Sequence, residues 1–316
     1  MVSVKYKTIN GKKYLYAEHS FRLPNGKIKK ISKLIQNKEE EKNRGIKDYF
    51  LKKQMESYQD YALETYKPDS ILNEEQIKKL EQIKVEYKEI MKSFTKNQIK
   101  DILDRFTVNF TYESNAIEGN SLTLKDVTLI LGENVVPKNK DLREVYETRN
   151  TREAHELLFK NKVKINIKDI INIHSILVKD TGVQLGFKKL PNYLLMRDLK
   201  TTPPEKVEEE MNKLILWYKA SKNKIHPLRL VSEFHARFES IHPFDDGNGR
   251  TGRILLNAIL FEHNYPPLII RKTARIAYFS SLEAFDKGYK NKLERFLLDK
   301  IKDTFEKFFK IYVKYL

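Results

Sequence analysis

The run of chain from His242 to Arg253 contains residue types that can act on phosphates. It reads His242-Pro243-Phe244-Asp245-Asp246-Gly247-Asn248-Gly249-Arg250-Thr251-Gly252-Arg253. Pro243 disfavours helical backbone at His242, so a helix that precedes it should end there. Gly247 and Gly249 free the backbone for positive φ and leave room for a close approach. A second helix then begins near Gly249, and the loop N–H groups converge on its N-terminus, where an anion can bind.

The side chains of the same run suit a polyphosphate bound together with a divalent cation. Arg250 and Arg253 lie three residues apart on the second helix, project along one face, and can each make charge-assisted hydrogen bonds to phosphate oxygens. Asp246 offers a hard oxygen ligand for Mg²⁺ held jointly with substrate phosphates. Asn248 can donate its amide to charge developing on the reacting phosphate. Histidine ordinarily titrates near neutrality, so His242 is the natural general base, and the run predicts phosphoryl-type transfer.

This run is similar to the signature of Fic-domain proteins, H-P-F-x-[D/E]-G-N-G-R-x-x-R, and matches each fixed position. A helix–glycine turn–helix with an incidental histidine would show some of these features, but their order and intervals favour the resemblance. The resemblance implies a mainly α fold: a Fic-type helical bundle core with a short β-hairpin flap. It also implies a protein adenylyltransferase, an enzyme that transfers AMP from ATP to a protein hydroxyl with Mg²⁺.

The resemblance assigns roles to individual residues. His242 would deprotonate a Ser, Thr or Tyr hydroxyl that attacks the α-phosphate, Asp246 would hold Mg²⁺, and Asn248 would steady the α-phosphate. Arg250 and Arg253 would hold the outer phosphates, and pyrophosphate would leave. The nucleotide-binding residues implied in this way are Phe244, Gly247, Asn248, Gly249, Arg250, Arg253 and Tyr278. Relatives with Lys at the position of Gly249 act as kinases of the Doc type, so glycine favours nucleotidyl transfer.

A second motif, Ser114-Asn115-Ala116-Ile117-Glu118-Gly119-Asn120, lies upstream. It resembles the inhibitory motif of the family, [S/T]-x-x-x-E-[G/N], and Ser114 and Glu118 share a helix face. The resemblance implies that Glu118 pairs with Arg253 and takes that guanidinium away from the γ-phosphate. This is the class of Fic protein whose inhibitory helix lies N-terminal to the core. The alternative is an ordinary helix end at which Gly119 stops the helix.

The segment Lys179–Pro204 occupies the place of the flap hairpin that docks the target by strand addition. Its extended run is Tyr193-Leu194-Leu195-Met196, and Phe187-Lys188-Lys189 stands where Gly-Tyr-Arg is common in the family. Target specificity therefore stays open. Tyr278 and Leu282 fall where the family shapes its adenine pocket.

Patterning along the chain predicts the elements that position these residues. Residues 1–36 alternate in polarity around turns at Asn10-Gly11 and Pro24-Asn25-Gly26, which indicates a small antiparallel sheet. Helical spacing begins near Lys38 and breaks near Pro68. The expected divisions are a β element at 1–36, a helical region at 37–96, a Fic core at 97–300 that includes an inhibitory helix near 111–120, and a C-terminal helix end at 301–316.

Helical periodicity also predicts the helices of the core and places the remaining histidines on them. The expected helices are 98–115, 123–131, 142–158, 167–178, 205–219, 228–240, 250–263, 278–287 and 291–315. His155, His174 and His235 lie in such segments without partners at metal spacing, so we expect them to be structural. Asp245 occupies the variable position of the signature and receives no ligand role. The apolar stripe of 291–315 suits core packing or a contact in a homodimer.

Composition limits the class of protein. The 316 residues include 60 basic and 43 acidic side chains, a net charge of +17, with 34 Phe and Tyr residues and no cysteine. So many aromatics argue against disorder, and the absence of cysteine removes disulfides and thiolate metal sites. We see no signal-peptide core and no apolar run of membrane-spanning length. We therefore expect a globular protein of the cytoplasm.

Two alternatives to the adenylyltransferase remain open. A de-AMPylase would use the same residues, with Glu118 positioning a water molecule. A nucleic-acid-binding or scaffold protein would use the Fic core only to sense nucleotide, and its support is the +17 charge and the basic residues 1–95. The protein target could also be a second copy of the chain itself.

Overall fold

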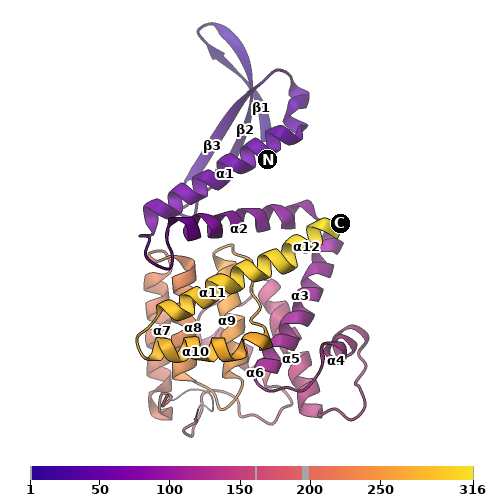
Figure 1. Cartoon of the computed structure of the whole chain (residues 1–316), viewed down its shortest axis with the longest axis vertical. Coiled ribbons are helices and arrows are strands. Elements are labelled where there is room, and N and C mark those ends of the chain that lie inside the picture. The colour runs from indigo at the N-terminus through magenta and orange to yellow at the C-terminus, as the bar shows by residue number, and fades with distance from the viewer. Residues whose placement is uncertain (1, 161, 194–198, 316) are drawn as a thin grey trace. The chain divides into compact units, whose positions relative to one another are not determined.

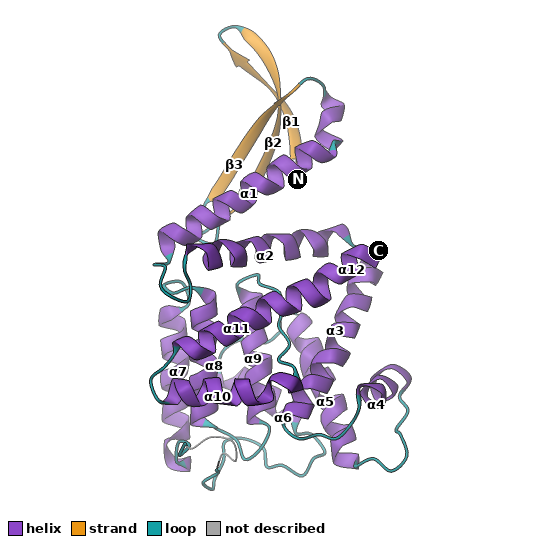
Figure 2. Cartoon of the chain, in the orientation of Figure 1, coloured by secondary structure: helices purple, strands orange, loops and turns teal. Residues whose placement is uncertain are grey.

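The computed structural model describes residues 2–160, 162–193 and 199–315, and part of the expected flap strand, Leu194–Met196, lies outside them. The chain divides into two compact units, Met1–Val85 and Glu86–Leu316 (Figure 1). Helices dominate the described residues, and their strands form one small antiparallel sheet near the N-terminus (Figure 2). The mainly α fold class expected from the sequence is confirmed.

The N-terminal unit begins with strands β1 (Val2–Ile9), β2 (Lys12–Arg22) and β3 (Ile28–Ile35), in the order β1-β2-β3. Asn10 and Gly11 join β1 to β2 with φ values of 49° and 77°, the left-handed pair that a two-residue hairpin requires. After a short 3₁₀ turn (Lys38–Lys42), α1 runs from Arg44 to Thr65. Helix α2 (Glu74–Ser93) crosses the boundary between the two units.

One face of the sheet packs against α1. Leu15, Ala17 and Ile35 point from the sheet toward Ile46 and Phe50 of the helix, and these five side chains are buried together. A small sheet is unstable in water unless one face is covered in this way, so α1 supplies the missing half of the core. The opposite face of the sheet is covered by no element of this unit that the structure describes.

The second unit is built from helices. Its elements are α3 (Lys96–Ile117), α4 (Leu124–Thr128), a π-helical turn (Leu129–Glu133), α5 (Leu142–Phe159), α6 (Ile167–Leu177), a 3₁₀ turn (Pro204–Lys206), α7 (Val207–Ser221), α8 (Pro227–Ile241), α9 (Asn248–Glu262), a 3₁₀ turn (Lys272–Ala274), α10 (Arg275–Asp286), α11 (Asn291–Thr304), a π-helical segment (Phe305–Phe309) and α12 (Lys310–Tyr315). The expected helix 291–315 is thus one helical run with a π-helical segment in the middle.

Side-chain caps fix where several of these helices begin. Thr95 and Gln98 form a reciprocal capping box at the start of α3. Asp141 and Asn166 accept hydrogen bonds from the first turns of α5 and α6. Pro227 occupies the first position of α8, where its missing N–H costs nothing. Local sequence therefore sets the helix starts that tertiary packing then uses.

Helix α9 is the centre of the second unit. Every residue from Arg250 to Leu260 is buried. It packs against α8 on one side and α5 and α6 on another, while α10 and α11 cross α8 (Figure 1). A helix buried on all sides is held in one position, so side chains at its N-terminus are placed with little freedom. Among the described helices, none has the length and apolar character needed to span a membrane.

Candidate active site

The loop between α8 and α9 turns sharply at both ends. Helix α8 ends at Ile241, and His242 follows in the left-handed region with φ 50° and ψ 62°. Gly247 has φ 77°, and α9 begins at the next residue, Asn248. A non-glycine residue in the left-handed region is uncommon and needs support from its surroundings. The backbone N–H of His242 donates to the carbonyl of Phe238 at 3.0 Å, which closes the last turn of α8.

Phe244 anchors this loop in the interior. Its ring is fully buried and stacks on His174 of α6, with centroids 3.7 Å apart and planes 7° from parallel. The Nε2 of His174 lies 3.0 Å from the carbonyl oxygen of Asp246 and, since a carbonyl only accepts, carries the hydrogen. Phe244 is not among the residues that line the pocket described below and supports the loop from the interior, and its expected part in nucleotide binding stays a prediction.

Asn248 closes the loop from the other end. Its Oδ1 accepts from the backbone N–H of Phe244 at 2.9 Å, and its Nδ2 donates to the carbonyl of the same residue at 2.8 Å. The amide is buried, and one of its two N–H bonds is used in this way. Asn248 therefore shapes the loop, and a single N–H remains for any charge developing above it.

A pocket of about 280 Å³ opens above the loop and the N-terminus of α9. It brings together predicted site residues from distant parts of the chain. Those that line it are Glu118, His242, Asp246, Gly247, Asn248, Gly249, Arg253 and Tyr278. Five further residues that received no role in the sequence also line it: Tyr193, Glu239, Asp245, Arg275 and Phe279. Arg275 and Phe279 lie on the same helix as Tyr278, so a search for neighbours at helical spacing could have found them.

Arg253 is held by the C-terminal end of α3. Its Nη2 donates to Glu118 Oε1 at 2.7 Å and to the carbonyl of Ser114 at 2.9 Å, and its Nε donates to Ser114 Oγ at 2.9 Å. The Arg253 side chain is 3% exposed and the Glu118 side chain 37%. Burial alone would lower the pKa of Arg253, but the Glu118 carboxylate and nearby groups raise it above the ordinary value. Three hydrogen bonds therefore hold a buried cation at the edge of the pocket.

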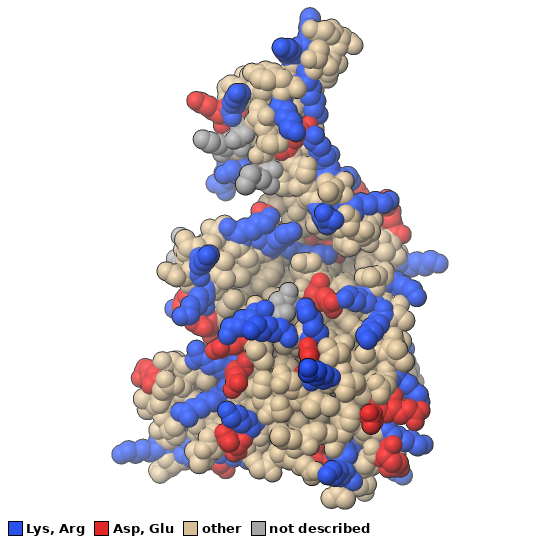
Figure 3. All heavy atoms as spheres, turned by 180° about the vertical axis from the view of Figure 1, so that it is seen from behind, with Lys and Arg blue, Asp and Glu red and all other residues tan. Residues whose placement is uncertain are grey.

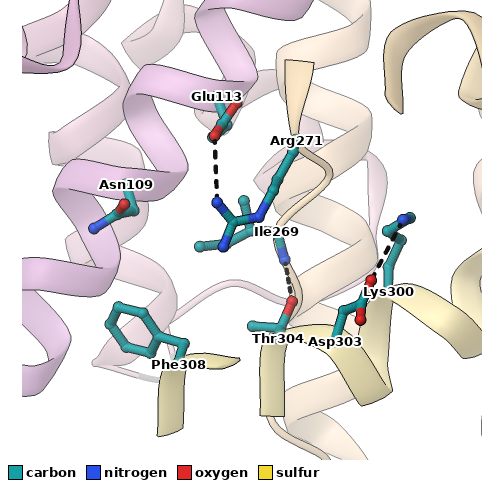
Figure 4. A pocket seen from close by; sticks show the side chains of 8 residues that line it. All are labelled: Asn109, Glu113, Ile269, Arg271, Lys300, Asp303, Thr304 and Phe308. Carbon is teal, nitrogen blue, oxygen red and sulfur yellow. Dashed lines mark hydrogen bonds and ion pairs between the residues drawn. The ribbon is translucent and has the colours of Figure 1, made fainter. Parts of the chain in front are cut away.

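Other contacts fix the same end of α3. Arg275 Nε donates to the carbonyl of Ile117 at 2.7 Å, one of the carbonyls that a helix end leaves unpaired. Glu113 Oε2 accepts from the backbone N–H of Lys272 at 2.7 Å. Figure 4 shows the small cleft beside this contact, where Glu113 also faces Arg271 and Thr304 accepts from the backbone of Ile269. The helix end that carries Glu118 is therefore fastened on two sides.

Gly249 leaves the space that Glu118 occupies. A Cβ atom built on Gly249 would lie 2.1 Å from Glu118 Oε1 and 3.0 Å from Arg253 Nη1. The first distance is far below any real contact, so a side chain at position 249 would displace the carboxylate. Glu118 can therefore occupy this position only because residue 249 is a glycine. Gly119 has a φ of 104° and follows the end of α3 directly after Glu118. The motif is therefore also an ordinary helix end at which a glycine stops the helix.

Arg250 makes its ion pairs with other acids than Arg253 does. Its Nη1 is 3.4 Å from Glu147 of α5, and its Nη2 is 3.6 Å from Asp246. It is buried and does not line the pocket. The two arginines are separated by almost one helical turn, so each leans toward the acid of a different neighbouring helix.

Asp246 faces solvent at the rim of the pocket. Its side chain is 45% exposed and accepts from Arg143 and from the backbone of Gly247. Among the residues that the structure describes, no cluster of three or more His, Asp or Glu side chains could hold a metal ion. A single exposed carboxylate at a phosphate-sized opening still fits Mg²⁺, because this ion keeps most of its waters and takes few protein ligands.

The first part of the expected flap segment is hydrogen-bonded to the loop through Lys188 and Asn192. The backbone N–H of Lys188 donates to the carbonyl of Pro243 at 2.9 Å, and Asn192 Nδ2 donates to the carbonyl of Phe244 at 2.8 Å. Lys188 Nζ donates to Asn192 at 2.7 Å and to Thr201 at 3.0 Å. Burial lowers the pKa of Lys188 to about 8. Asn192 had no expected role, and Lys188 was noted only as a departure from the family pattern.

Tyr278 and the histidines of the core occupy defined places. Tyr278 is fully buried, borders the pocket and is hydrogen-bonded to His235 Nε2 at 2.7 Å, and burial raises its pKa. Leu282, expected beside it, is buried and does not line the pocket. His155 and His174 are buried as predicted, and burial lowers their pKa values to about 3 and about 4.

Comparisons with known proteins point to one family. A family model described as Fic/DOC family matches residues 164–260, which include the whole loop and its flanking helices. Protein adenylyltransferase Fic of Nematostella vectensis is 33% identical over 182 residues, which cover 56% of this chain and 43% of that protein. Protein adenylyltransferase fic-1 of Caenorhabditis elegans is 32% identical over 186 residues, 57% of this chain and 36% of that protein. The chain thus spans less than half the length of these relatives.

The fold agrees with this assignment. The crystal structure of a Fic domain containing signaling protein from Bacteroides thetaiotaomicron superposes with a TM-score of 0.68, covers 74% of this chain and 97% of that chain, and is 23% identical in sequence. At this identity the likeness shows a shared fold. Residues 164–260 therefore match the Fic/DOC family, and the chain shares its fold with a solved Fic-domain structure.

Proposed function

We propose that this chain is a protein adenylyltransferase that transfers AMP from ATP to a Ser, Thr or Tyr hydroxyl of a protein. The observation that carries the proposal is the pocket in which His242, the glycine-bordered N-terminus of α9 and Arg253 meet. A base, an anion-binding helix start and a buried cation within one opening are what attack on a phosphate of a triphosphate requires. Relatives that match more than half of this chain bear the same activity in their names.

In the proposed reaction, His242 accepts the proton of the target hydroxyl. The hydroxyl oxygen forms a bond to the α-phosphorus, the bond from that phosphorus to the bridging oxygen breaks, and pyrophosphate leaves with the electron pair. The N–H groups at the start of α9 and the remaining N–H of Asn248 stabilise the charge on the α-phosphate. Asp246 would hold Mg²⁺, which would supply positive charge beside the outer phosphates.

The same proposal includes autoinhibition by Glu118. The carboxylate occupies the pocket wall at Gly249 and engages Arg253, the cation that the outer phosphates need. While that hydrogen bond persists, a triphosphate meets a carboxylate in place of a guanidinium, so it binds in a non-productive position. Release of Glu118 would return Arg253 to the nucleotide.

The test is auto-labelling with ATP that carries the label on its α-phosphate. We expect Glu118→Gly to raise labelling and the further change His242→Ala to abolish it. Asp101→Asn is a matched control, because the carboxylate that it removes is also on α3 but pairs with Arg105 at the surface. If the double variant labels as strongly as Glu118→Gly alone, His242 is not the base and the proposed reaction fails.

A reverse activity is the second candidate, because Glu118 lies in the same pocket as His242 and its side chain is 37% exposed. There Glu118 would orient a water molecule and accept its proton as the water oxygen bonds to the phosphorus of AMP bound to a protein. The bond from that phosphorus to the protein oxygen would break, and His242 would give that oxygen a proton. Loss of AMP from a modified protein with the wild-type chain, and no loss with Glu118→Gly, would favour this de-AMPylase.

A further inference from the structure

The first 35 residues carry a large part of the positive charge of the chain. They contain nine Lys or Arg residues and one acidic residue, Glu18, while the whole chain has a net charge of +17. Lys and Arg side chains are spread over this unit in Figure 3, in the upper part of the view. The match to the Fic/DOC family begins at residue 164, far downstream of these residues in the sequence.

Strand register divides the charge unequally between the two faces of the sheet. Cross-strand rows such as Val4↔Ala17 and Tyr6↔Leu15↔Ile35 face α1. The alternate rows form the opposite face, which we call the outer face: Ser3↔Glu18↔Ser32, Lys5↔Tyr16↔Leu34, Lys7↔Tyr14, Ile9↔Lys12, Ser20↔Lys30 and Arg22↔Ile28. Five cations therefore stand on one face that no described element of the unit covers.

The single acid of the outer face is already neutralised. Glu18 is 2% exposed and lies 2.9 Å from Lys7 Nζ and 2.5 Å from Lys30 Nζ. Hydrogen bonds from Lys30 and Lys7 lower its pKa to about 2, so it stays ionised at neutral pH. Glu18 draws both lysines to the middle of the sheet and presents no free negative charge to a partner. The face is thus positive over its whole length.

Both ends of the sheet are two-stranded. β3 pairs with β2 only from Leu15 onward, so the turn of the β1–β2 hairpin projects beyond it with Lys12. At the other end, β1 pairs with β2 only as far as His19, so the β2–β3 hairpin projects with Arg22. A two-stranded ribbon is the β structure that fits the major groove of a duplex.

The length of the outer face matches a turn of duplex. Strand β2 has 11 residues, which at about 3.3 Å each span about 33 Å from Lys12 to Arg22. One turn of duplex DNA rises about 34–36 Å. The two basic hairpins would therefore meet phosphates about one turn apart on one side of a duplex.

We propose that the outer face of the β1–β2–β3 sheet binds duplex nucleic acid, chiefly through its phosphate backbone. Two other partners fit the face less well. Single strands bind through several exposed aromatic faces, but the ring of Tyr16 is covered by Lys7 Nζ at 4.7 Å, which leaves Tyr14 as the one exposed ring among the described outer-face residues. Membrane surfaces need a continuous apolar face, whereas Ile9, Leu34 and Ile28 stand in separate rows among the cations.

The test uses the full chain and a fluorescent mixed-sequence DNA duplex of about 16 base pairs, slightly longer than one turn. Fluorescence anisotropy gives the dissociation constant at salt concentrations from about 50 to about 200 mM. Five cations with one shared carboxylate predict a slope of log K against log salt of about −4. Affinity should rise with duplex length up to about one turn and change little beyond it.

Two triple variants with the same net charge separate the outer face from the charge of the whole chain. Lys5→Gln/Lys12→Gln/Arg22→Gln changes exposed outer-face residues, and we expect binding to weaken at least about tenfold and the slope to fall by about 3. Lys47→Gln/Lys52→Gln/Lys67→Gln changes exposed residues on α1 and just after it, and we expect less than about a threefold effect.

Three outcomes would overturn the proposal. Equal weakening by the two triple variants would mean that only overall charge matters. Tighter binding to the single strand than to the duplex would assign the face to unpaired strands, and tighter binding to vesicles of anionic lipid would assign it to a membrane. Circular dichroism and thermal melting of both variants establish that they fold like the wild type, and none of these measurements depends on adenylyl transfer.

Discussion

Replacing Glu118 by glutamine keeps the shape of the side chain and removes its charge, so it isolates the electrostatic part of the contact with Arg253. Glutamine can still accept the hydrogen bond from Arg253 Nη2 that the carboxylate now accepts at 2.7 Å. Glu118→Gly removes the whole contact. The two variants together therefore divide the proposed inhibition into a part that depends on charge and a part that depends on contact.

The burial of the two side chains sets the expected size of each part. A hydrogen bond that involves a charged group contributes about 1.5–3 kcal/mol, and because Arg253 stays charged, the bond that glutamine accepts from it lies at the lower end of this range. Because the Glu118 side chain is 37% exposed, solvent weakens the pair, and we take about 2 kcal/mol for the whole contact and about 1 kcal/mol for its charge. These values correspond to an increase in labelling rate of about 30-fold for Glu118→Gly and about fivefold for Glu118→Gln.

The assay is the initial rate of auto-labelling at saturating ATP, with Asp101→Asn as the control for loss of a carboxylate on α3. We expect the order wild type, glutamine variant, glycine variant. Equal rates for the glutamine and glycine variants would show that shape contributes nothing, and a glutamine variant as slow as the wild type would show that charge contributes nothing. Either result would refute the division. No increase with the glycine variant would refute the inhibition itself.

Three further predictions concern residues around the same loop. Ser114→Ala leaves the buried Nε of Arg253 without its acceptor, so labelling should rise about fivefold, and Ser114→Thr should not change it. Lys188→Met in the Glu118→Gly background should lower labelling about tenfold, because it removes the hydrogen bonds of Lys188 to Asn192 and Thr201, and Lys188→Arg should restore labelling. A variant with a lower melting temperature and unchanged labelling would contradict a role of Lys188 in positioning the loop. Burial lowers the pKa of His174 to about 4, below the value of about 6.5 in an unfolded chain. Between these two pH values the unfolded chain binds a proton at His174 and the folded chain does not. The free energy of unfolding therefore falls as the pH falls from about 6.5 to about 4, by on the order of 3 kcal/mol. His174→Gln can still donate to the carbonyl of Asp246, so it should reduce the dependence of the urea midpoint on pH, while the part that comes from the buried His155 remains, and an unchanged profile would contradict the assignment.

Local sequence was enough to predict the helices and the turn between α8 and α9. The expected helix 228–240 is α8 (Pro227–Ile241), and the expected helix 250–263 is α9 (Asn248–Glu262), with Pro243 and two glycines between them. Caps, prolines and glycines act over a few residues, so their effect can be found without knowing the fold. The same holds for the hairpin turn at Asn10-Gly11.

The supports of the loop could not be found in this way, because they come from distant segments. The stacking of Phe244 on His174 and the bond from Asn192 to the carbonyl of Phe244 join residues 70 and 52 positions apart. From the sequence, Phe244 was expected only as a nucleotide-binding residue. Its fully buried ring, which fills the space beneath the loop, depends on packing with distant segments.

The different acid partners of Arg250 and Arg253 come from the same long-range packing, and they affect which groups an entering nucleotide would meet. Each guanidinium is met by a carboxylate from a helix that precedes α9: Glu147 of α5 for Arg250, and Glu118 of α3 for Arg253. Of these two carboxylates, only Glu118 lines the pocket, and Arg250 does not line it either. Under the proposed inhibition, an incoming triphosphate would therefore have to displace Glu118 before it could reach Arg253. The Glu118–Arg253 pair would then act as a switch for the nucleotide, whereas the buried Arg250 would keep its contact with Glu147 as part of the packing.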